Sequence, residues 1–393
     1  MKNNKWIAPA FYFGTLISSV GSLTFNLCMI AFMLKAGFSL GEATLILGLQ
    51  RLIPAVVVGI WGHITDRLSP RPTVIVVEIL AALLSVGLLL LWKGADTPYA
   101  LFAAVSVLRA IIAAFQAGSR VKITKLLADD SYASNSKHAI WFNKATQGAT
   151  LFSGLTAVAF IKYLSFEAAI IFDAATFILN GIIIFLMPIG GEQESTSSAL
   201  ASWHQKFSDY FKFNPKAAKL DLLLAIAMMG TVAFQARVAG LDQSWTALFS
   251  ASYGLAVWSA GFWEKGGAAR IPSSPFWILL GIAYIMIGAY GQASWVTVGL
   301  FFLKDLTYWM VLHRISGHIQ TDTPATHIGG VTSARMTLMI LILSTGEILV
   351  GTWSQFVPLW LETVIRCALV FGVATYLMKQ NKQRVGASER ANF

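Results

Sequence analysis

The sequence predicts an all-α membrane protein with twelve transmembrane helices in two pseudo-symmetric six-helix bundles. Three observations predict this class: the composition, the spacing of the apolar segments and the placement of basic residues. Hydrophobic types make up 56% of the 393 residues and charged types only 12%. An average soluble domain carries roughly a quarter charged residues, so a soluble globule of this size could not cover its surface. Lipid is therefore expected around most of the chain, and a soluble enzyme or a disordered chain is excluded.

Twelve apolar stretches approach the length that a helix needs to cross the hydrocarbon core, about 20 residues. Six precede a long polar stretch and six follow it, a division typical of transporters built from two halves. This order predicts an N-terminal bundle over 1–188, a cytoplasmic linker over 189–216, a C-terminal bundle over 217–379 and a cytoplasmic tail over 380–393. The apolar stretches lie near 9–34, 41–62, 72–92, 98–118, 140–161, 166–188, 217–238, 243–263, 274–292, 294–314, 331–352 and 355–378.

Basic residues are concentrated in every second loop. If the N-terminus is cytoplasmic, the outer loops hold little beyond Lys35, Lys93 and Lys162. The positive-inside rule then predicts two cytoplasmic termini and a multi-pass protein of the bacterial inner membrane. Within the linker, aromatic residues over 203–213 favour either an amphipathic helix on the inner membrane surface or a solvated tether. The basic residues assigned to inner loops include Arg67, Arg71, Arg120, Lys122, Lys125, Lys137, Lys206, Lys212, Lys216, Lys219, Lys265 and Arg270.

The loop between the second and third stretches reads Gly-His-Ile-Thr-Asp-Arg-Leu-Ser-Pro-Arg over 62–71. A glycine at Gly62 allows close helix approach, and the carboxylate of Asp66 can cap a helix or pair with an arginine. Arg67 and Arg71 are expected to hold the loop on the cytoplasmic side. The loop resembles the signature of the major facilitator superfamily, which has glycine, three residues, aspartate, a basic residue and a basic cluster. The resemblance implies two halves that rock around a central site, with these four residues as gating residues.

Further residues resemble the exporter branch of that superfamily, which includes drug and macrolide efflux proteins and enterobactin-type siderophore exporters. The resemblance is carried by Arg109 with the Phe-Gln-Ala-Gly-Ser-Arg run over 115–120, and by Phe-Asp-Ala-Ala-Thr-Phe over 172–177. It implies a monomer that exports a small organic molecule by alternating access, driven by the proton gradient without a cofactor. Ser22 stands where many of these exporters have an acidic residue, so another carboxylate must carry the proton.

Two cations fall deep inside apolar stretches, where each costs a few kcal/mol unless it is paired or faces water. Arg109 lies 11 residues before Arg120, and Lys304 lies 10 before Arg314. Both are therefore about 15 Å from the cytoplasmic edge. The resembled fold lines its cavity with the fourth and tenth helices, so we expect the two cations to face each other and bind an anionic, siderophore-like cargo. The alternative is that both are internally paired, Lys304 with Asp305.

A second pair of opposite charges lies deeper. Arg51 precedes Asp66 by 15 residues and Glu347 follows Val331 by 16, which places both about 23 Å from the cytoplasmic edge. The resembled fold brings the second and eleventh helices into contact. We therefore expect an Arg51–Glu347 ion pair that breaks on rocking, with Arg51 as a further anion-binding group and Glu347 or Asp305 as proton carrier. The alternative is that Arg51 extends to the outer surface.

The remaining charged residues in the apolar stretches receive smaller roles. Arg237, near the outer end of the seventh helix, either lines the outer mouth as a substrate-binding group or is solvated. Asp173 and Glu78 lie on helices that are peripheral in the resembled fold, and they are expected to be structural.

Several other partners and functions are weighed against transport of an anion. The histidines lack metal-ligand spacing, and no phosphate-binding glycine motif indicates ATP. The net charge is +10, but the basic residues lie between apolar blocks rather than in one stripe, which argues against nucleic acid. Three alternatives stay open: a multidrug efflux antiporter with its charges locked in pairs, a nutrient or metabolite importer, and a scaffold or sensor that transports nothing.

Overall fold

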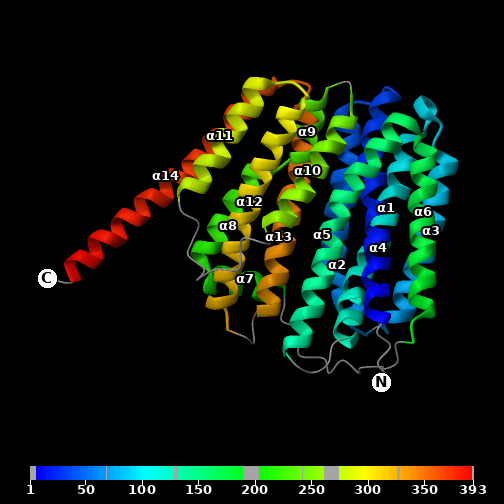
Figure 1. Ribbon diagram of the computed structural model, residues 1–393, viewed down its shortest axis with the longest axis horizontal. Coiled ribbons are helices and arrows are strands. Elements are labelled where there is room, and N and C mark those ends of the chain that lie inside the picture. The colour runs from blue at the N-terminus through cyan, green and yellow to red at the C-terminus, as the bar shows by residue number, and fades with distance from the viewer. Residues whose placement is uncertain are drawn as a thin grey trace.

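The structure is a computed structural model, and it describes residues 6–67, 69–127, 132–188, 203–240, 242–260, 274–324 and 328–391. All of the secondary structure in these ranges is helical (Figure 1). The helices are α1 (Ile7–Lys35), α2 (Leu40–Arg67), α3 (Pro70–Leu91), the short 3₁₀ turn η1 (Gly94–Asp96), α4 (Tyr99–Leu127), α5 (Tyr132–Tyr163), α6 (Phe166–Leu186), α7 (Trp203–Phe213), α8 (Pro215–Met228), α9 (Thr231–Ala239), α10 (Ser244–Ala260), α11 (Ser274–Tyr290), α12 (Trp295–Asp322), α13 (Ile328–Trp353) and α14 (Leu359–Ala391).

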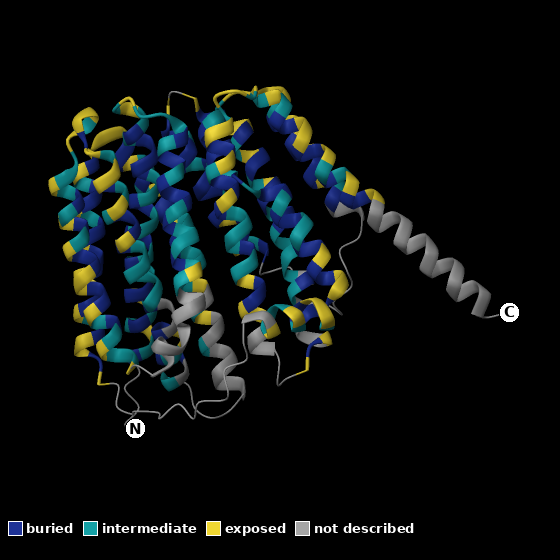
Figure 2. Ribbon diagram, turned by 180° about the vertical axis from the view of Figure 1, so that it is seen from behind, coloured by how far each residue is buried: buried dark blue, intermediate teal, exposed yellow. Residues whose placement is uncertain are grey.

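Every apolar stretch predicted from the sequence contains a helix, and one of them, 217–238, is interrupted between α8 and α9. Within the described residues, eight spans are long and apolar enough to cross a membrane, and α11 contains a shorter apolar segment, Trp277–Tyr290. Large apolar side chains such as Leu90, Phe185 and Trp295 are more than 60% exposed on the outside of the helices (Figure 2). A soluble monomer rarely exposes so much apolar surface. The prediction of an all-α membrane protein is confirmed, and twelve crossings with cytoplasmic termini stay a prediction.

The helices before and after α7 form two packed sets. Helices α1 to α6 pack on one another, and helices α8 to α14 do the same (Figure 1). The first set buries aromatic rings such as Phe25, Phe102 and Phe166, and the second set buries Trp277 and Tyr284. Aromatic side chains fill both interiors because each removes a large apolar area from its surroundings. The assignment of the two sets as separate bundles with the boundaries given above stays a prediction.

Two helix pairs make the main contacts between the sets, α2 with α13 and α5 with α10. Glycines permit the close approach. A Cβ atom at Gly48 would meet the side chain of Ile348, and one at Gly154 would lie 2.5 Å from the backbone nitrogen of Ala251. Small residues at helix crossings let backbones touch in this way. These contacts lie toward the end of the molecule opposite the chain's N-terminus, which we call the outer end. The two sets of helices are therefore packed against each other at this end.

The linker helix α7 is docked on the second set of helices. Tyr210 is fully buried and donates a hydrogen bond of 2.7 Å to Asp221 Oδ2. Asn214 donates one of 2.7 Å to the Thr323 hydroxyl, and Phe207 and Phe213 pack on the same core. The apolar face of α7 is thus used against protein. The segment is therefore a helix packed on protein rather than a solvated tether, and its position at the inner membrane surface stays a prediction.

Candidate functional site

The seventh apolar stretch is broken at Met229 and Gly230. Gly230 has a φ of +66°, a conformation that glycine adopts without steric cost. A Cβ atom there would also lie 2.5 Å from the side chain of Val350. The break removes helical partners from carbonyl groups of α8, and a backbone carbonyl left unpaired in a membrane interior is costly. Side chains must therefore donate hydrogen bonds to these carbonyl groups.

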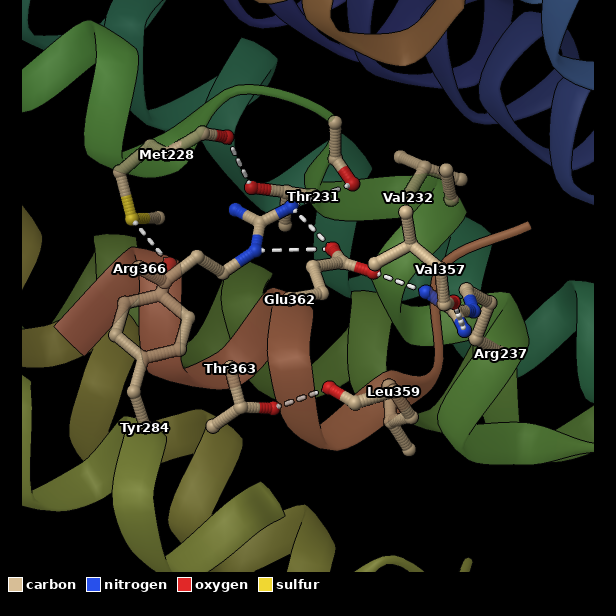
Figure 3. Close-up of polar contacts among 12 residues, drawn as sticks. Met228, Thr231, Val232, Arg237, Tyr284, Val357, Leu359, Glu362, Thr363 and Arg366 are labelled. Atoms are coloured by element: carbon tan, nitrogen blue, oxygen red, sulfur yellow. Dashed lines mark hydrogen bonds and ion pairs between the residues drawn. The ribbon is translucent and has the colours of Figure 1, made fainter. Parts of the chain in front are cut away.

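Arg366 of α14 supplies two of these bonds. Its guanidinium donates to the carbonyl of Ala227 at 3.2 Å and to that of Gly230 at 3.4 Å. The hydroxyl of Tyr284 donates to the Ala227 carbonyl at 3.3 Å, and Thr231 Oγ1 donates to the Met228 carbonyl at 2.5 Å. Figure 3 shows Arg366, Tyr284 and Thr231 arranged around the break. The end of α8 is therefore held by side chains from two other helices and from α9.

Glu362 sits between two arginines beside the break (Figure 3). Its Oε1 accepts from Arg366 at 2.7 and 3.0 Å, and its Oε2 accepts from Arg237 at 2.5 Å. Arg237 also donates to the carbonyl of Val357 at 2.6 Å, and its side chain is only 13% exposed. Arg237 is therefore not solvated, because a neighbouring carboxylate binds it, and its role as a substrate-binding group at the outer mouth stays a prediction.

Glu347 of α13 binds the other side of the break. Its two carboxylate oxygens accept from the backbone N–H groups of Val232 and Ala233, at 3.0 Å each. A carboxylate is stabilised there because the first turn of a helix presents unpaired N–H groups and a partial positive charge. Glu347 is 2% exposed. It is the buried acid that fixes the start of α9.

Arg51 approaches the same carboxylate from the first set of helices. Its Nη1 lies 3.7 Å from Glu347 Oε1, and its side chain is 39% exposed. The distance is longer than that of a hydrogen-bonded ion pair. The structure thus brings Arg51 and Glu347 together across the contact between α2 and α13. The roles predicted for them, anion binding and proton transfer, stay predictions.

Arg109 is not a free cation. Its Nη1 donates to Asp173 Oδ2 at 2.6 Å, and Ser85 donates to the same oxygen at 2.9 Å. The guanidinium lies 4.2 Å from the ring centroid of Phe25, a position favourable for a cation–π contact. Arg109 is 4% exposed. The expectation that it faces a cavity unpaired is wrong, because burial of a lone guanidinium costs more than pairing it with a neighbouring carboxylate.

Lys304 is fully buried, and its Nζ lies 2.7 Å from Asp305 Oδ1. The ammonium also lies 5.2 Å from the ring centroid of Phe301 and 5.7 Å from that of Tyr284. Adjacent residues on a helix point in different directions, but the long lysine side chain bends back to its neighbour. The expectation that Lys304 faces Arg109 as a second unpaired cation is therefore wrong.

Two further buried ion pairs lie outside this region, and sequence reasoning misassigned or missed their members. Arg120, expected in an inner loop, is inside α4 and donates to Glu78 Oε1 at 3.1 Å. Gln116 and Asn180 donate to the same oxygen. In the second set, Arg335 Nε donates to Asp221 Oδ2 at 2.5 Å, and its Nη2 donates to Oδ1 at 2.9 Å. The residues missed altogether are Asp221, Arg335, Glu362 and Arg366.

The predicted gating residues are only partly described. Gly62, Asp66 and Arg67 belong to α2, but their side chains lie outside the described residues. Arg71 lies in the first turn of α3 and donates to the carbonyl of Phe185 at 2.5 Å, which ties α3 to the end of α6. Among the residues that the structure describes, no group of three or more His, Cys, Asp or Glu side chains could hold a metal ion.

No protein-family model and no curated protein matches the sequence. Solved structures do match it. A point mutant of the nucleoside transporter NupG is 11% identical with a TM-score of 0.68, covering 95% of this chain and 99% of that one. A bacterial homolog of the human lysosomal transporter Spinster, inward-facing and occupied, is 12% identical with a TM-score of 0.70, covering 97% of both. A POT family transporter bound to a thioalcohol-conjugated peptide is 13% identical with a TM-score of 0.68, covering 95% and 96%.

These neighbours are transporters of the major facilitator type and not enzymes. At such low identity the likeness shows the fold alone. The chain therefore has the fold of major facilitator transporters, with a charged, interrupted helix at the contact between its two sets of helices.

Proposed function

We propose that the protein is a secondary active transporter that exports a small organic molecule with an anionic group in exchange for protons. The bacterial inner membrane and a monomeric state are part of the same proposal. The shared fold supports transport. The nucleoside and peptide in the names of its structural neighbours are small polar organic molecules, which supports a cargo of that size. The observation that carries the proposal is the position of Glu347 between Arg51 and the start of α9.

Glu347 links three elements through its charge. It attracts Arg51 of α2, and it accepts two hydrogen bonds from α9 while belonging to α13. On the opposite side of the break, Arg366 reaches the carbonyl of Gly230 from α14, and Glu362 pairs with both Arg366 and Arg237. Protonation of Glu347 removes the negative charge, so the attraction to Arg51 and to the positive end of α9 falls together. The contact between α2 and α13 weakens as a result.

An anionic substrate would weaken the same contact from the other side. The Arg51 guanidinium lies 3.7 Å from Glu347, too far for a hydrogen bond, so it can still donate to a carboxylate or similar group of a substrate. Either a proton on Glu347 or an anion on Arg51 therefore breaks the ion pair. The empty, deprotonated protein keeps the pair and stays closed at the outer end. Such a protein exchanges substrate for protons without leaking either, because neither half-reaction proceeds with an unloaded site.

The choice of anion rests on Arg51 alone. Arg109 and Lys304, which suggested a siderophore-like cargo, are each held by a carboxylate. An anionic group on a small organic molecule is what the site supports, and a metal-chelating cargo is one member of that class.

Multidrug efflux is the second candidate, and the same ion pairs favour it. With Arg109, Lys304 and Arg237 all paired, a lipophilic compound meets few free charges on its path. Import of a nutrient differs from export only in direction, which flux measurements decide.

The test combines cells and vesicles. Cells lacking the gene are compared with cells expressing the wild type or Glu347→Gln, and spent medium is analysed for organic anions and for iron-chelating activity. We expect an anion that accumulates outside wild-type cells and inside the deletion strain and the variant. In proteoliposomes with a pH-sensitive dye inside, that anion should drive proton movement in wild type only. Drug sensitivity of the deletion strain with unchanged anion export would favour multidrug efflux.

A further inference from the structure

Lysines are concentrated where the linker helix α7 meets α8. Residues 206–219 contain four lysines and one acidic residue, Asp209, so this junction carries a net charge of +3. The proposed exchange of substrate for protons uses none of these lysines, so their position on the surface needs a separate explanation. Three of them are exposed and one is half-buried, in that order Lys212, Lys216, Lys219 and Lys206.

The opposite side of α7 holds the helix against the protein. The Tyr210 hydroxyl donates to Asp221 of α8, and the Asn214 amide donates to the Thr323 hydroxyl just after α12. Both hydrogen bonds are buried, so α7 cannot turn its lysines inward without breaking them. The exposed side also carries an apolar group, because Phe211 is 45% exposed. The docked helix therefore presents an aromatic ring and ammonium groups together to its surroundings.

The junction lies at the level where the chain enters the membrane. Helix α7 is at the end of the molecule nearer the chain's N-terminus (Figure 1). A segment long and apolar enough to span a membrane begins at Pro215, directly after α7. Lys212 precedes this boundary by three residues, and Lys216 follows it by one. Basic side chains and aromatic rings commonly occupy this depth, where headgroups take the place of hydrocarbon.

The positive charge of the junction is only partly offset by acids. Asp322 is exposed at the end of α12, next to the Thr323 that binds Asn214. Together with Asp209 it balances two of the four lysines, so an excess of positive charge remains. Such an excess attracts an anionic membrane surface, and the attraction grows with each lysine and falls as salt is added. A zwitterionic surface is not attracted in this way.

We propose that the exposed side of the α7–α8 junction binds the headgroups of anionic phospholipids. Lys212 and Lys216 donate to the headgroup phosphate, and the ring of Phe211 packs against the lipid beside it. An ammonium group both hydrogen-bonds to phosphate oxygens and neutralises their charge. A soluble acidic partner would match the lysines, but it would not account for an exposed ring at the start of a membrane span.

The bound lipid is attached to the second set of helices rather than to the whole linker. Helix α7 is bonded to α8 and to the residue after α12, so a headgroup held by its lysines moves with those helices. This contact requires neither the transported substrate nor the ion pair of Glu347. It therefore stands or falls independently of the proposed exchange mechanism.

The test measures which lipid lies against the exposed side. Ser208 is exposed one turn before Lys212, and the native Cys28 and Cys367 are buried, so a bimane fluorophore attached to Ser208→Cys reports this side. The full-length protein is placed in phosphatidylcholine vesicles that contain increasing fractions of nitroxide-labelled phosphatidylglycerol or, in a parallel series, nitroxide-labelled phosphatidylcholine. The nitroxide quenches the fluorophore on contact. We expect half-maximal quenching at an about tenfold lower fraction of the anionic lipid.

Paired variants then assign this preference to the lysines. Lys212→Gln with Lys216→Gln should reduce the preference to about twofold or less, and arginine at both positions should keep it. Lys93→Gln with Lys162→Gln removes the same charge from exposed positions at the outer end, and it should leave the preference unchanged. A full preference in the glutamine pair at the junction would refute the role of the two lysines.

The wild type alone can also overturn the proposal. Equal quenching by the two lipids would show contact with lipid but no recognition of charge. No quenching by either lipid would show that this side faces water or another protein. Where the glutamine pair fails to fold, added salt replaces it, because screening should shrink the preference for phosphatidylglycerol. A preference that salt leaves unchanged would contradict binding through exposed lysines.

Discussion

The first six helices and the helices after α7 use buried charge in different ways. In the first set, Glu78 and Asp173 bind side chains of neighbouring unbroken helices. The second set contains one such pair, Asp221 with Arg335, but there Arg366 and Glu347 also bind backbone atoms on both sides of the break between α8 and α9. Side-chain pairs fasten one rigid helix to another. Charges on a broken backbone instead hold that backbone in its shape, which is why we propose the proton-responsive element in the second set.

The largest expected effect is in the first set. Arg109→Met leaves Asp173 buried without its charge partner, which should lower the free energy of unfolding by about 3–5 kcal/mol. Adding Asp173→Leu to the same variant should restore most of the loss, because two apolar side chains replace the pair. Reversible unfolding in mixed micelles measures both. A double variant as unstable as Arg109→Met alone would contradict this explanation, because the loss would then not come from an unpaired Asp173 charge.

Arg366→Met should have a smaller and more local effect. It leaves the carbonyls of Ala227 and Gly230 short of donors, while Glu362 keeps Arg237, so we expect a loss of about 2–4 kcal/mol. Hydrogen exchange should rise in α8 and α9 and stay unchanged in α1 to α6. Exchange that rises equally in both sets would remove the distinction drawn between them. Lys162→Met, at an exposed position, is the control.

Gly230→Ala tests the break itself. Gly94 has almost the same φ, +63° against +66°, but open space around it, whereas Gly230 faces Val350. Gly94→Ala should cost about 1–2 kcal/mol from the backbone alone, and Gly230→Ala should cost about 1–3 kcal/mol more from overpacking. Equal losses in thermal unfolding would mean that Val350 does not hold the break.

The smallest effect is expected at the docked linker. Tyr210→Phe removes the hydrogen bond to Asp221 and should cost about 1–2 kcal/mol. Burial and the charge of Asp221 raise the pKa of the Tyr210 hydroxyl above its ordinary value. Its contribution is therefore complete below about pH 10, the unfolded value, and declines as the pH rises through the folded pKa. The free energy of unfolding should be higher for the wild type than for Tyr210→Phe at pH 7, and the difference should shrink only at alkaline pH.

The helices could be predicted from the sequence because a run of apolar residues long enough to cross a bilayer has few other stable conformations. The approach of Arg51 to Glu347 was also predictable, because the two residues lie at equal depth on two helices that are in contact in the resembled fold. The ion pair of Glu362 with Arg366 could also have been predicted, because an acidic and a basic residue four positions apart on a helix lie on the same face.

The pairing of Arg109 and Lys304 was not predictable from depth. Depth along a helix comes from counting residues, whereas a partner depends on how each helix is rotated about its axis, which single-sequence spacing does not state. Arg120 was assigned to a loop because α4 continues to Leu127, past the end of its apolar stretch. The break at Gly230 gave no signal of its own, since glycine is frequent in transmembrane helices that are not interrupted.

The most direct test of the account follows the outer end of the molecule with pH. Spin labels at Ala36 and Phe356, in the connections after α1 and after α13, report the separation of the two sets of helices by pulsed electron paramagnetic resonance. The account predicts a short distance at neutral pH that lengthens as the pH falls, and a long distance at both pH values in Glu347→Gln. A distance that stays short at low pH in the wild type, or in Glu347→Gln at any pH, would contradict it.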